Sequence, residues 1–270
     1  LTGANLTNAD LSNADLNGVD LSNATLTGVR SGGITGVPLA LPTNWQLTDG
    51  YLIGPYANLN GAFLNGIDLL NAKLYAATLT NAHLDSVDLT TANINRVVSG
   101  GITGVPHALP TNWQLTDGYL IGPYANLNGA TLTNANLTGA NLEHAILVGS
   151  HLYAATLTNA HLDSVDLTTA NINRVVSGGI TGMPHALPTN WQLTDGYLIG
   201  PYAHLAGATL SGAVLTNAHL EHTILSGTDL TNANLTGANL TDASGAAKYN
   251  LATILPSGFD PVAAGWTLVS

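Results

Sequence analysis

Cysteine is absent from the 270 residues, which excludes disulfide bonds, thiolate metal ligands and a cysteine nucleophile. Basic residues are scarce, because 5 Lys and Arg stand against 16 Asp and Glu, for a net charge of -11. Binding to nucleic-acid phosphates depends on clustered Lys and Arg, so the sequence indicates no nucleic-acid partner. The chain also lacks an apolar run of roughly 18 residues, so no membrane span is expected.

Charge of either sign is rare, since only 8% of the residues are charged while 45% are hydrophobic. Lys, Glu and Arg usually solubilise helical surfaces, whereas Asn and Thr take that place here. The chain begins at Leu1, inside a repeating pattern, and we interpret it as a processed protein or a part of a longer one. The absence of cysteine leaves the compartment open, and we favour an exported or extracellular location over the cytoplasm.

Leucine or isoleucine recurs at every fifth position in four blocks, which lie within residues 6–26, 59–94, 127–172 and 205–240. A small residue, usually Ala, stands two places before each of them. A period of five fits neither a helix nor a plain strand, so the chain must turn within every repeat. We expect Leu and the small residue to point inward and the turn to fall on Asn or Gly. In the first block these corner positions are Asn8, Asn13, Gly18, Asn23 and Gly28.

Repeats such as Ala9-Asp10-Leu11-Ser12-Asn13 and Ala135-Asn136-Leu137-Thr138-Gly139 resemble the pentapeptide-repeat family. The resemblance implies an all-β fold over residues 1–240, a right-handed four-sided parallel β-helix (β-solenoid) of about 20 residues per coil. It also implies a rival function, because some members of the family mimic DNA and bind type II topoisomerases.

Three near-identical inserts interrupt the repeats and begin at Ser31, Ser99 and Ser177. Each contains Trp-Gln-Leu-Thr-Asp-Gly-Tyr-Leu-Ile, in which apolar and polar residues alternate around an Asp-Gly turn. This pattern predicts β-hairpins near residues 32–52, 100–120 and 178–198 that lie as flaps on the solenoid wall. If each hairpin takes roughly 18 residues out of the coil, the second and third project from one face and the first from the opposite face.

The five-residue rhythm stops after Leu240, and aromatic residues such as Phe259 and Trp266 follow. The open end of a solenoid exposes unpaired backbone and apolar side chains, which a dissimilar terminal unit covers. We therefore interpret residues 241–270 as a C-terminal cap.

Most of the aromatic residues lie in the inserts, and they form our candidate interaction surface because Trp and Tyr often anchor protein interfaces. The alternative is that each ring packs down and holds its hairpin on the wall. The candidate residues are Trp45, Tyr51, Tyr56, Trp113, Tyr119, Tyr124, Trp191, Tyr197 and Tyr202.

Histidines and carboxylates are the remaining candidates for metal binding or acid–base catalysis. The nine His show no twenty-residue spacing within the blocks, so we expect no metal site. Asp68 and Asp88 are twenty residues apart, as are Glu143 and Asp163, and each pair should stack on adjacent coils. A narrow coil filled with Leu offers no cleft for acid–base chemistry, so no catalytic residue and no cofactor are expected.

These observations favour a non-catalytic structural or protein-interaction scaffold, an exported bacterial surface module that binds a protein or surface partner. The alternative is a DNA-mimic protein that binds a type II topoisomerase. Mimicry requires long rows of carboxylates, and the stacked pairs in this sequence are only two members long.

Overall fold

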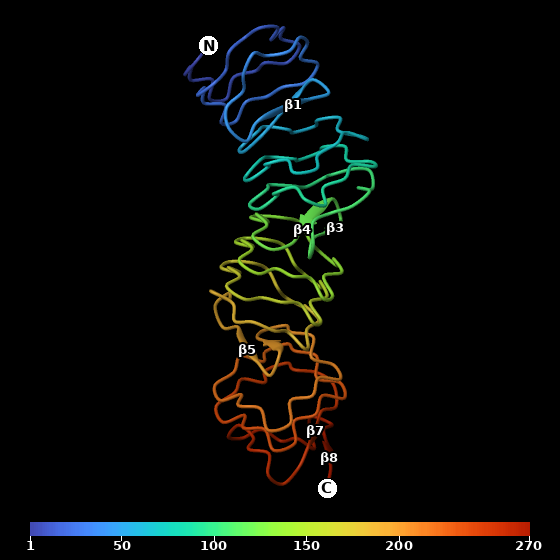
Figure 1. Ribbon diagram of the computed structural model, residues 1–270. Helices are drawn as coiled ribbons and strands as arrows, with labels where there is room; N and C mark the ends of the chain where they lie inside the picture. The colour runs from blue at the N-terminus through green and yellow to red at the C-terminus, as the bar shows by residue number, and fades with distance from the viewer. The chain divides into compact units, whose positions relative to one another are not determined.

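The computed structural model describes residues 1–270 and divides into two compact units, Leu1–Leu127 (unit 1) and Asn128–Ser270 (unit 2). Neither unit contains a helix. Within each unit the chain winds through successive stacked coils, as Figure 1 shows. The fold is therefore all-β, as the sequence predicts.

A tight turn closes every five-residue repeat. In the first repeat, the amide of Ala9 donates to the carbonyl of Leu6 (2.9 Å), and Asn8 lies between them with a φ of 59°. Only Gly, and to a lesser degree Asn or Asp, adopts a positive φ readily, which explains the sequence preference at this position. All the corners predicted in the first block have a positive φ.

The outward Asn or Asp of a repeat supports the same turn. The Oδ1 atom of Asp10 accepts a hydrogen bond from the amide of Ser12 (2.9 Å), and Asn136 binds the amide of Thr138 in the same way (3.1 Å). Such side-chain bonds satisfy a backbone amide that the turn leaves free. The outward residue therefore contributes to the corner as well as to the surface.

Coils pair with one another in a register of twenty residues. Parallel bridges join Asn5 to Thr25 and Asp15 to Thr35 in unit 1, and Thr131 to His151 in unit 2. Four repeats thus complete one coil, which confirms the four-sided arrangement. Each repeat contributes only a single bridge residue, so most sides of the coil are too short to count as strands.

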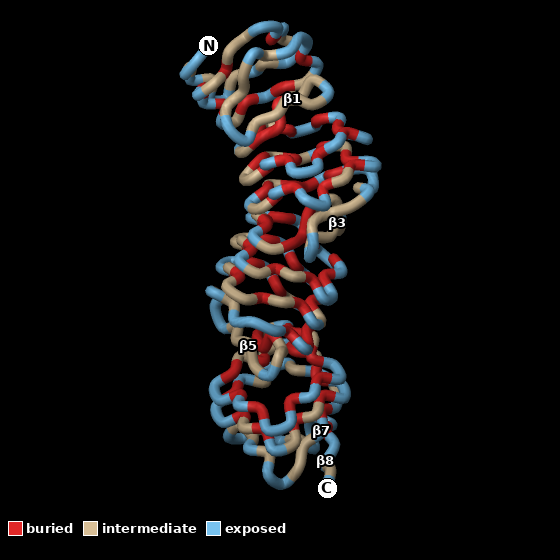
Figure 2. Tube along the Cα trace, in the orientation of Figure 1, coloured by how far each residue is buried: buried red, intermediate tan, exposed pale blue.

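The core is a column inside each unit, as the buried residues of Figure 2 show. Its members are the Leu and the small apolar residues of successive repeats; Leu64, Leu84 and Val87, for example, are fully buried in unit 1. Burying a Leu side chain contributes about 1.5–3 kcal/mol before conformational entropy is subtracted. Because each Leu packs against its neighbours one coil away, adjacent coils stabilise each other.

Antiparallel hairpins form the strands of the three inserts. Their bounds are β1 (Gln46–Thr48) with β2 (Tyr51–Ile53), β3 (Gln114–Thr116) with β4 (Tyr119–Ile121), and β5 (Gln192–Thr194) with β6 (Tyr197–Ile199). In the first, Gln46 pairs with Ile53 and Thr48 with Tyr51, so that Asp49 and Gly50 form the turn. The other two hairpins have the same register.

The estimate of 18 residues outside the coil is wrong. Arg30 pairs with Asn58, 28 positions further on instead of 20, so the first insert adds only eight residues to its coil. Thr35 and Ala40 still pair with Asp15 and Asp20, so residues 31–40 continue the coil and the extra chain lies beyond them.

The orientation deduced from that estimate is consequently wrong for the first two hairpins. One column of paired residues runs along a face of unit 1, and the first and second inserts begin directly after two of its members, Arg30 and Val98. Hairpins β1–β2 and β3–β4 therefore leave unit 1 from the same face, not from opposite ones. The members of the column are Asp10, Arg30, Asn58, Thr78, Val98 and Asn126.

The inserts are also not flaps outside the wall, because the second strand of each enters the core. Ser31 occupies a position where the repeats carry Leu, and its Oγ accepts a hydrogen bond from the buried amide of Leu52 (2.9 Å). Leu52 and Ile53 are themselves fully buried. Because Ser is smaller than Leu, it leaves space near the axis of the coil. The apolar side chains of β2 fill that space.

Coil pairing continues beyond Leu240. Lys248 pairs with Asp229 and Ile254 with Asn234, and β7 (Lys248–Tyr249) pairs in parallel with β8 (Thr267–Leu268). Trp266 is buried against Tyr249 and Phe259, with ring centroids 6.3 and 4.8 Å away. These contacts close the apolar end of the column, and we propose that residues 241–270 act as its cap.

A first prediction separates inward from outward positions. Leu137→Asp places an unpaired charge in the buried ladder and should lower the free energy of unfolding by several kcal/mol. Asn136→Ala removes one exposed hydrogen bond to Thr138 and should cost about 1 kcal/mol or less. Denaturant unfolding of the two variants measures the difference, and equal losses would contradict the assignment of faces.

A second prediction concerns the attachment of the hairpins. Ser99→Ala leaves the buried amide of Leu120 without its acceptor (2.9 Å) and should destabilise the protein by about 1–3 kcal/mol. Ser257→Ala, at an exposed position, is the control and should have no measurable effect. Thermal melting of both variants tests the role of the Ser hydroxyl, which would be refuted if Ser99→Ala melted like the wild type.

Candidate interaction surface

The three insert tryptophans pack against glycine. A Cβ atom built on Gly54 would overlap the ring of Trp45, so the ring covers the backbone of the chain just after β2. Trp45 is half-buried and contacts the core. Trp113 covers Gly122 and Trp191 covers Gly200 in the same manner. These contacts are the ones expected if the rings hold the hairpins in place.

The first tyrosine of each hairpin lies beside another glycine. A Cβ on Gly32 would come within 3.0 Å of the Tyr51 ring, and the Tyr51 hydroxyl accepts a hydrogen bond from the amide of Phe63 (3.1 Å). Tyr119 over Gly100 and Tyr197 over Gly178 repeat the arrangement. These half-buried rings contribute little surface to a partner.

The second tyrosine is different. Tyr56, Tyr124 and Tyr202 occupy corners with a φ of 60–61° and are exposed to 47%, 38% and 40%. Tyr56 meets Tyr75 edge to face at 5.6 Å, and Tyr202 stacks on His222 at 4.5 Å. Of the nine candidate residues, these three are exposed and the other six are half-buried.

In unit 1, two of these exposed tyrosines share one corner of the coil. Backbone hydrogen bonds link the corner of Tyr56 to that of Ala76, then Arg96, then Tyr124. Three coil steps of about 4.8 Å separate the two rings along the axis, roughly 14 Å in all. We call the exposed or half-buried side chains along it, Tyr56, Tyr75, Arg96 and Tyr124, the Tyr56–Tyr124 ridge. In unit 2, Arg174 and Tyr202 are likewise neighbours at one corner.

Other exposed rings escaped the sequence analysis. Phe63, exposed to 67%, stacks on His83 with a centroid distance of 4.4 Å and an interplanar angle of 5°. The Nδ1 atom of His83 is hydrogen-bonded to the hydroxyl of Thr103 at 2.7 Å. The three residues are spaced by twenty, and that spacing is the signal that would have identified them.

The carboxylate pair predicted at Asp68 and Asp88 is present, because a parallel bridge joins these two residues. The hydroxyl and amide of Thr90 donate to Asp88 Oδ1 (2.6 and 2.9 Å), and these bonds hold the pKa of Asp88 below its usual value. Glu143 lies one coil from Asp163, whose carbonyl accepts the amide of His144. No three His, Asp or Glu residues come together in a metal-binding arrangement.

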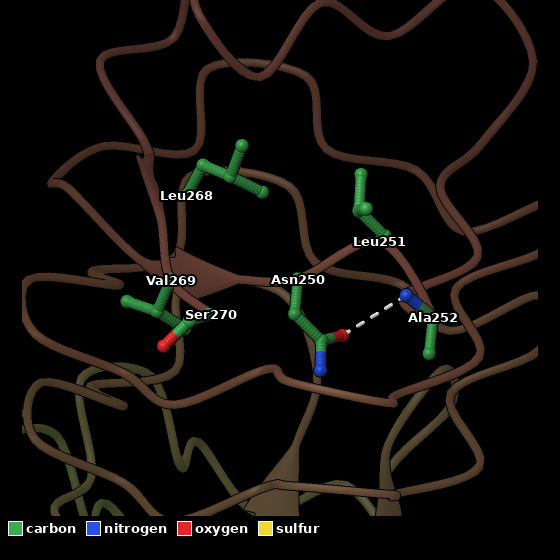
Figure 3. Close-up of a pocket in the computed structure, with 6 residues that line it drawn as sticks. All are labelled: Asn250, Leu251, Ala252, Leu268, Val269 and Ser270. Atoms are coloured by element: carbon green, nitrogen blue, oxygen red, sulfur yellow. Dashed lines mark hydrogen bonds between the residues drawn. The ribbon is translucent and has the colours of Figure 1, made fainter.

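An apolar hollow of about 470 Å³ lies at the C-terminal end of unit 2 (Figure 3). Asn250, Leu251 and Ala252 line one side, and Leu268–Ser270 line the other. Asn250 Oδ1 accepts the amide of Ala252 at 3.2 Å, and Leu251 is 95% exposed. The side chains that line this hollow are those of Asn, Leu, Ala, Val and Ser, none of which titrates near neutral pH.

Ion pairs are few. The three within 4.0 Å all join a His to a carboxylate, for example His219 to Glu221 at 3.0 Å. Burial raises the pKa of Glu221, but hydrogen bonds from its own backbone amide and from the side chains of His219 and Asn239 together keep this pKa below its usual value. The chain also forms no helix of the length and apolarity that crossing a membrane requires.

The family model 'Pentapeptide repeats (8 copies)', which represents eight successive repeats, matches this chain. The matched segments are residues 1–30, 56–90, 123–147, 135–174 and 203–243. These segments cover more than half of the chain. The chain belongs to the pentapeptide-repeat family. Pentapeptide-repeat proteins form right-handed quadrilateral β-helices, and the twenty-residue coils of this structure are of that kind.

Solved structures of pentapeptide-repeat proteins are similar to this chain. HetL, involved in heterocyst differentiation regulation in the cyanobacterium Nostoc sp. strain PCC 7120, is 26% identical, with 96% of this chain and 92% of HetL covered and a TM-score of 0.18. Rfr23 from the cyanobacterium Cyanothece 51142 is 16% identical, with 91% and 90% covered and a TM-score of 0.17.

A third structure, QnrB1, is a plasmid-mediated fluoroquinolone resistance protein that is 13% identical, with 72% of this chain and 92% of QnrB1 covered and a TM-score of 0.23. No curated protein matches the chain.

The lowered pKa of Asp88 leads to a prediction about acid stability. A carboxyl whose pKa is lower in the folded state stabilises the protein above its unfolded pKa of about 3.9, and this stability is lost as the pH falls through the folded pKa. Asp88→Asn keeps the Oδ1 acceptor but does not titrate. Its melting temperature should therefore fall less than that of the wild type between about pH 5 and pH 3.

Asp88→Ala, which lacks the acceptor for Thr90, is the matched control and should melt below Asp88→Asn across this range. Wild type and Asp88→Asn losing the same melting temperature on acidification would show that this carboxylate plays no part in acid unfolding.

Proposed function

We propose that this chain is a non-catalytic protein-interaction scaffold, an exported bacterial surface module that binds its partner through the Tyr56–Tyr124 ridge. The observation that carries the proposal is the alignment of two exposed tyrosines and an exposed arginine on one corner of unit 1. Tyr and Arg are the residues, with Trp, that contribute most to binding at protein interfaces.

The backbone at the ridge supports this role because it is held on both sides. The amide of Gly28 donates to the carbonyl of Tyr56 (2.9 Å), and the amide of Tyr56 donates to the carbonyl of Tyr75 (2.8 Å). A ring on a fixed backbone loses little conformational entropy when a partner binds. The faces beside the ridge are largely neutral Asn and Thr, which form hydrogen bonds without the desolvation cost of charges.

The proposal of a non-catalytic role rests on what the interior and the hollows contain. Leu and Ala fill the coils, and the hollow at the C-terminal end of unit 2 is lined by apolar side chains and small polar ones. Pentapeptide-repeat proteins are generally non-catalytic scaffolds. An exported location is consistent with the absence of cysteine and the low charge.

The rival function, DNA mimicry toward a type II topoisomerase, finds less support. A mimic requires carboxylates repeated along the axis at the density of phosphates. The column of Asp68 and Asp88 continues with Ala108, and Asp10 is followed by Arg30. Each acidic column is thus interrupted after one or two coils.

The scaffold proposal is tested by crosslinking to bacterial envelope and cytosolic fractions, followed by mass spectrometry. A ridge variant carrying Tyr56→Ser, Arg96→Ser and Tyr124→Ser should lose the crosslinked proteins of the wild type. The control variant carries Val37→Ser, Leu39→Ser and Leu70→Ser, which remove exposed apolar side chains away from the ridge. The control should retain those proteins; retention by both variants would refute the assignment of the ridge.

A gyrase supercoiling assay addresses the rival function separately. The wild type should neither inhibit gyrase nor protect it from a fluoroquinolone. Protection or inhibition at low protein concentration would establish the rival in place of the surface scaffold.

A further inference from the structure

A polar hollow of about 350 Å³ lies on unit 1, and its lining includes no residue of the ridge. Arg30, Asn58, Asn60, Gly61, Thr80 and Asn81 line it, so it spans three consecutive coils. Small-molecule sites occupy about 300–1,000 Å³, and this hollow is at the small end of that range. Gly61 leaves room in the lining, since a Cβ at this position would meet no atom within 4 Å.

Backbone amides fix the orientation of the asparagine side chains around the hollow. Asn58 Oδ1 accepts the amide of Asn60 (3.2 Å), and Asn60 Oδ1 accepts the amide of Thr80 (3.1 Å). With each carbonyl oxygen bound to the backbone, the Nδ2 groups of both side chains remain as donors for a ligand. The oxygen of Asn81 is likewise directed away, against Gly101 of the next coil.

Arg30 supplies the charge of the hollow. It is exposed and has no carboxylate oxygen within 4.0 Å. Asp10 precedes it in the same column, but Asp10 Oδ1 accepts the amide of Ser12 at 2.9 Å. The positive charge of Arg30 makes a minor contribution to lowering the pKa of Asp10, after the bonds from Ser12. The guanidinium therefore keeps its directed hydrogen-bond donors free.

We propose that this hollow binds the carboxylate of a small hydroxylated ligand, of the uronic acid class. A guanidinium binds a carboxylate through two parallel hydrogen bonds, a geometry that lysine does not provide. The amide donors of Asn58 and Asn60 and the hydroxyl of Thr80 match the hydroxyl and ring oxygens of such a ligand. Its size, that of one sugar unit, suits the volume of the hollow.

The inference is independent of the proposed partner binding, because no residue of the hollow belongs to the Tyr56–Tyr124 ridge. Either one can fail without the other. The two features also differ in chemistry, since the ridge offers aromatic surface and the hollow offers a set of donors around one positive charge.

The test is a titration of the whole chain, labelled with ¹⁵N, with glucuronate, glucose and N-acetylglycine, followed by amide chemical shifts. Glucuronate should produce saturable shifts at Asn58, Asn60 and Thr80, in the millimolar range expected for a single sugar on an open site. Glucose lacks the carboxylate and N-acetylglycine lacks the hydroxyls. Each should bind at least tenfold more weakly, and equal binding of either compound would overturn the proposal.

Two variants assign the site. Arg30→Ala should weaken glucuronate binding at least tenfold. Asn60→Asp keeps the oxygen that accepts the amide of Thr80 but replaces the donor with a negative charge, so it should weaken binding similarly without changing the melting temperature. Lys73→Ala removes an exposed cation elsewhere on unit 1 and should leave the affinity unchanged. Unaltered binding by Arg30→Ala, or equal loss in Lys73→Ala, would refute the site.

Discussion

The fold depends on one packing constraint, the narrowness of the coil interior. Two inward residues per repeat fill it, a Leu and a small residue, and both pack against their counterparts twenty residues away. A larger side chain at the small position would overfill the column, and a smaller one in place of Leu would leave a cavity. The turns, the positive φ at the corners and the single-residue bridges all follow from returning the chain to this column every five residues.

The inserts satisfy the same constraint by another route. Ser31 takes a Leu position, and Leu52 from β2 fills the interior that it leaves. Glycine at 32 and 54 then allows Tyr51 and Trp45 to lie against the backbone. Among the aromatic residues of the candidate interaction surface, the tryptophans and the first tyrosine of each hairpin are thus half-buried against the backbone, and the exposed rings are those at the corners.

The sequence predicts the coil well, because the five-residue period and the Asn or Gly corners are local signals that repeat many times. It predicts the Asp-Gly hairpins too, but it failed for the length of chain that each insert places outside the coil, since that length depends on which residues re-enter the core. Nothing local marks Leu52 and Ile53 as interior residues. The hollow at Arg30 was missed for a related reason, because Asn58 and Thr80 reach it only through coil pairing across an insert.

The twenty-residue register also makes the position of each side chain on its coil depend on the number of residues that precede it, much as a codon depends on its reading frame. A substitution on an outer face mainly affects the contacts of residues twenty positions away. The sequences of the different faces of one coil can therefore change nearly independently of each other. Deleting a single residue within a repeat would instead move every later side chain to a wrong position on its coil. Length can therefore change without this penalty only by whole coils, or in a stretch such as residues 41–44, which lies between the paired coil residue Ala40 and the hairpin β1–β2. The three inserts occupy the kind of position where such a frame tolerates new sequence.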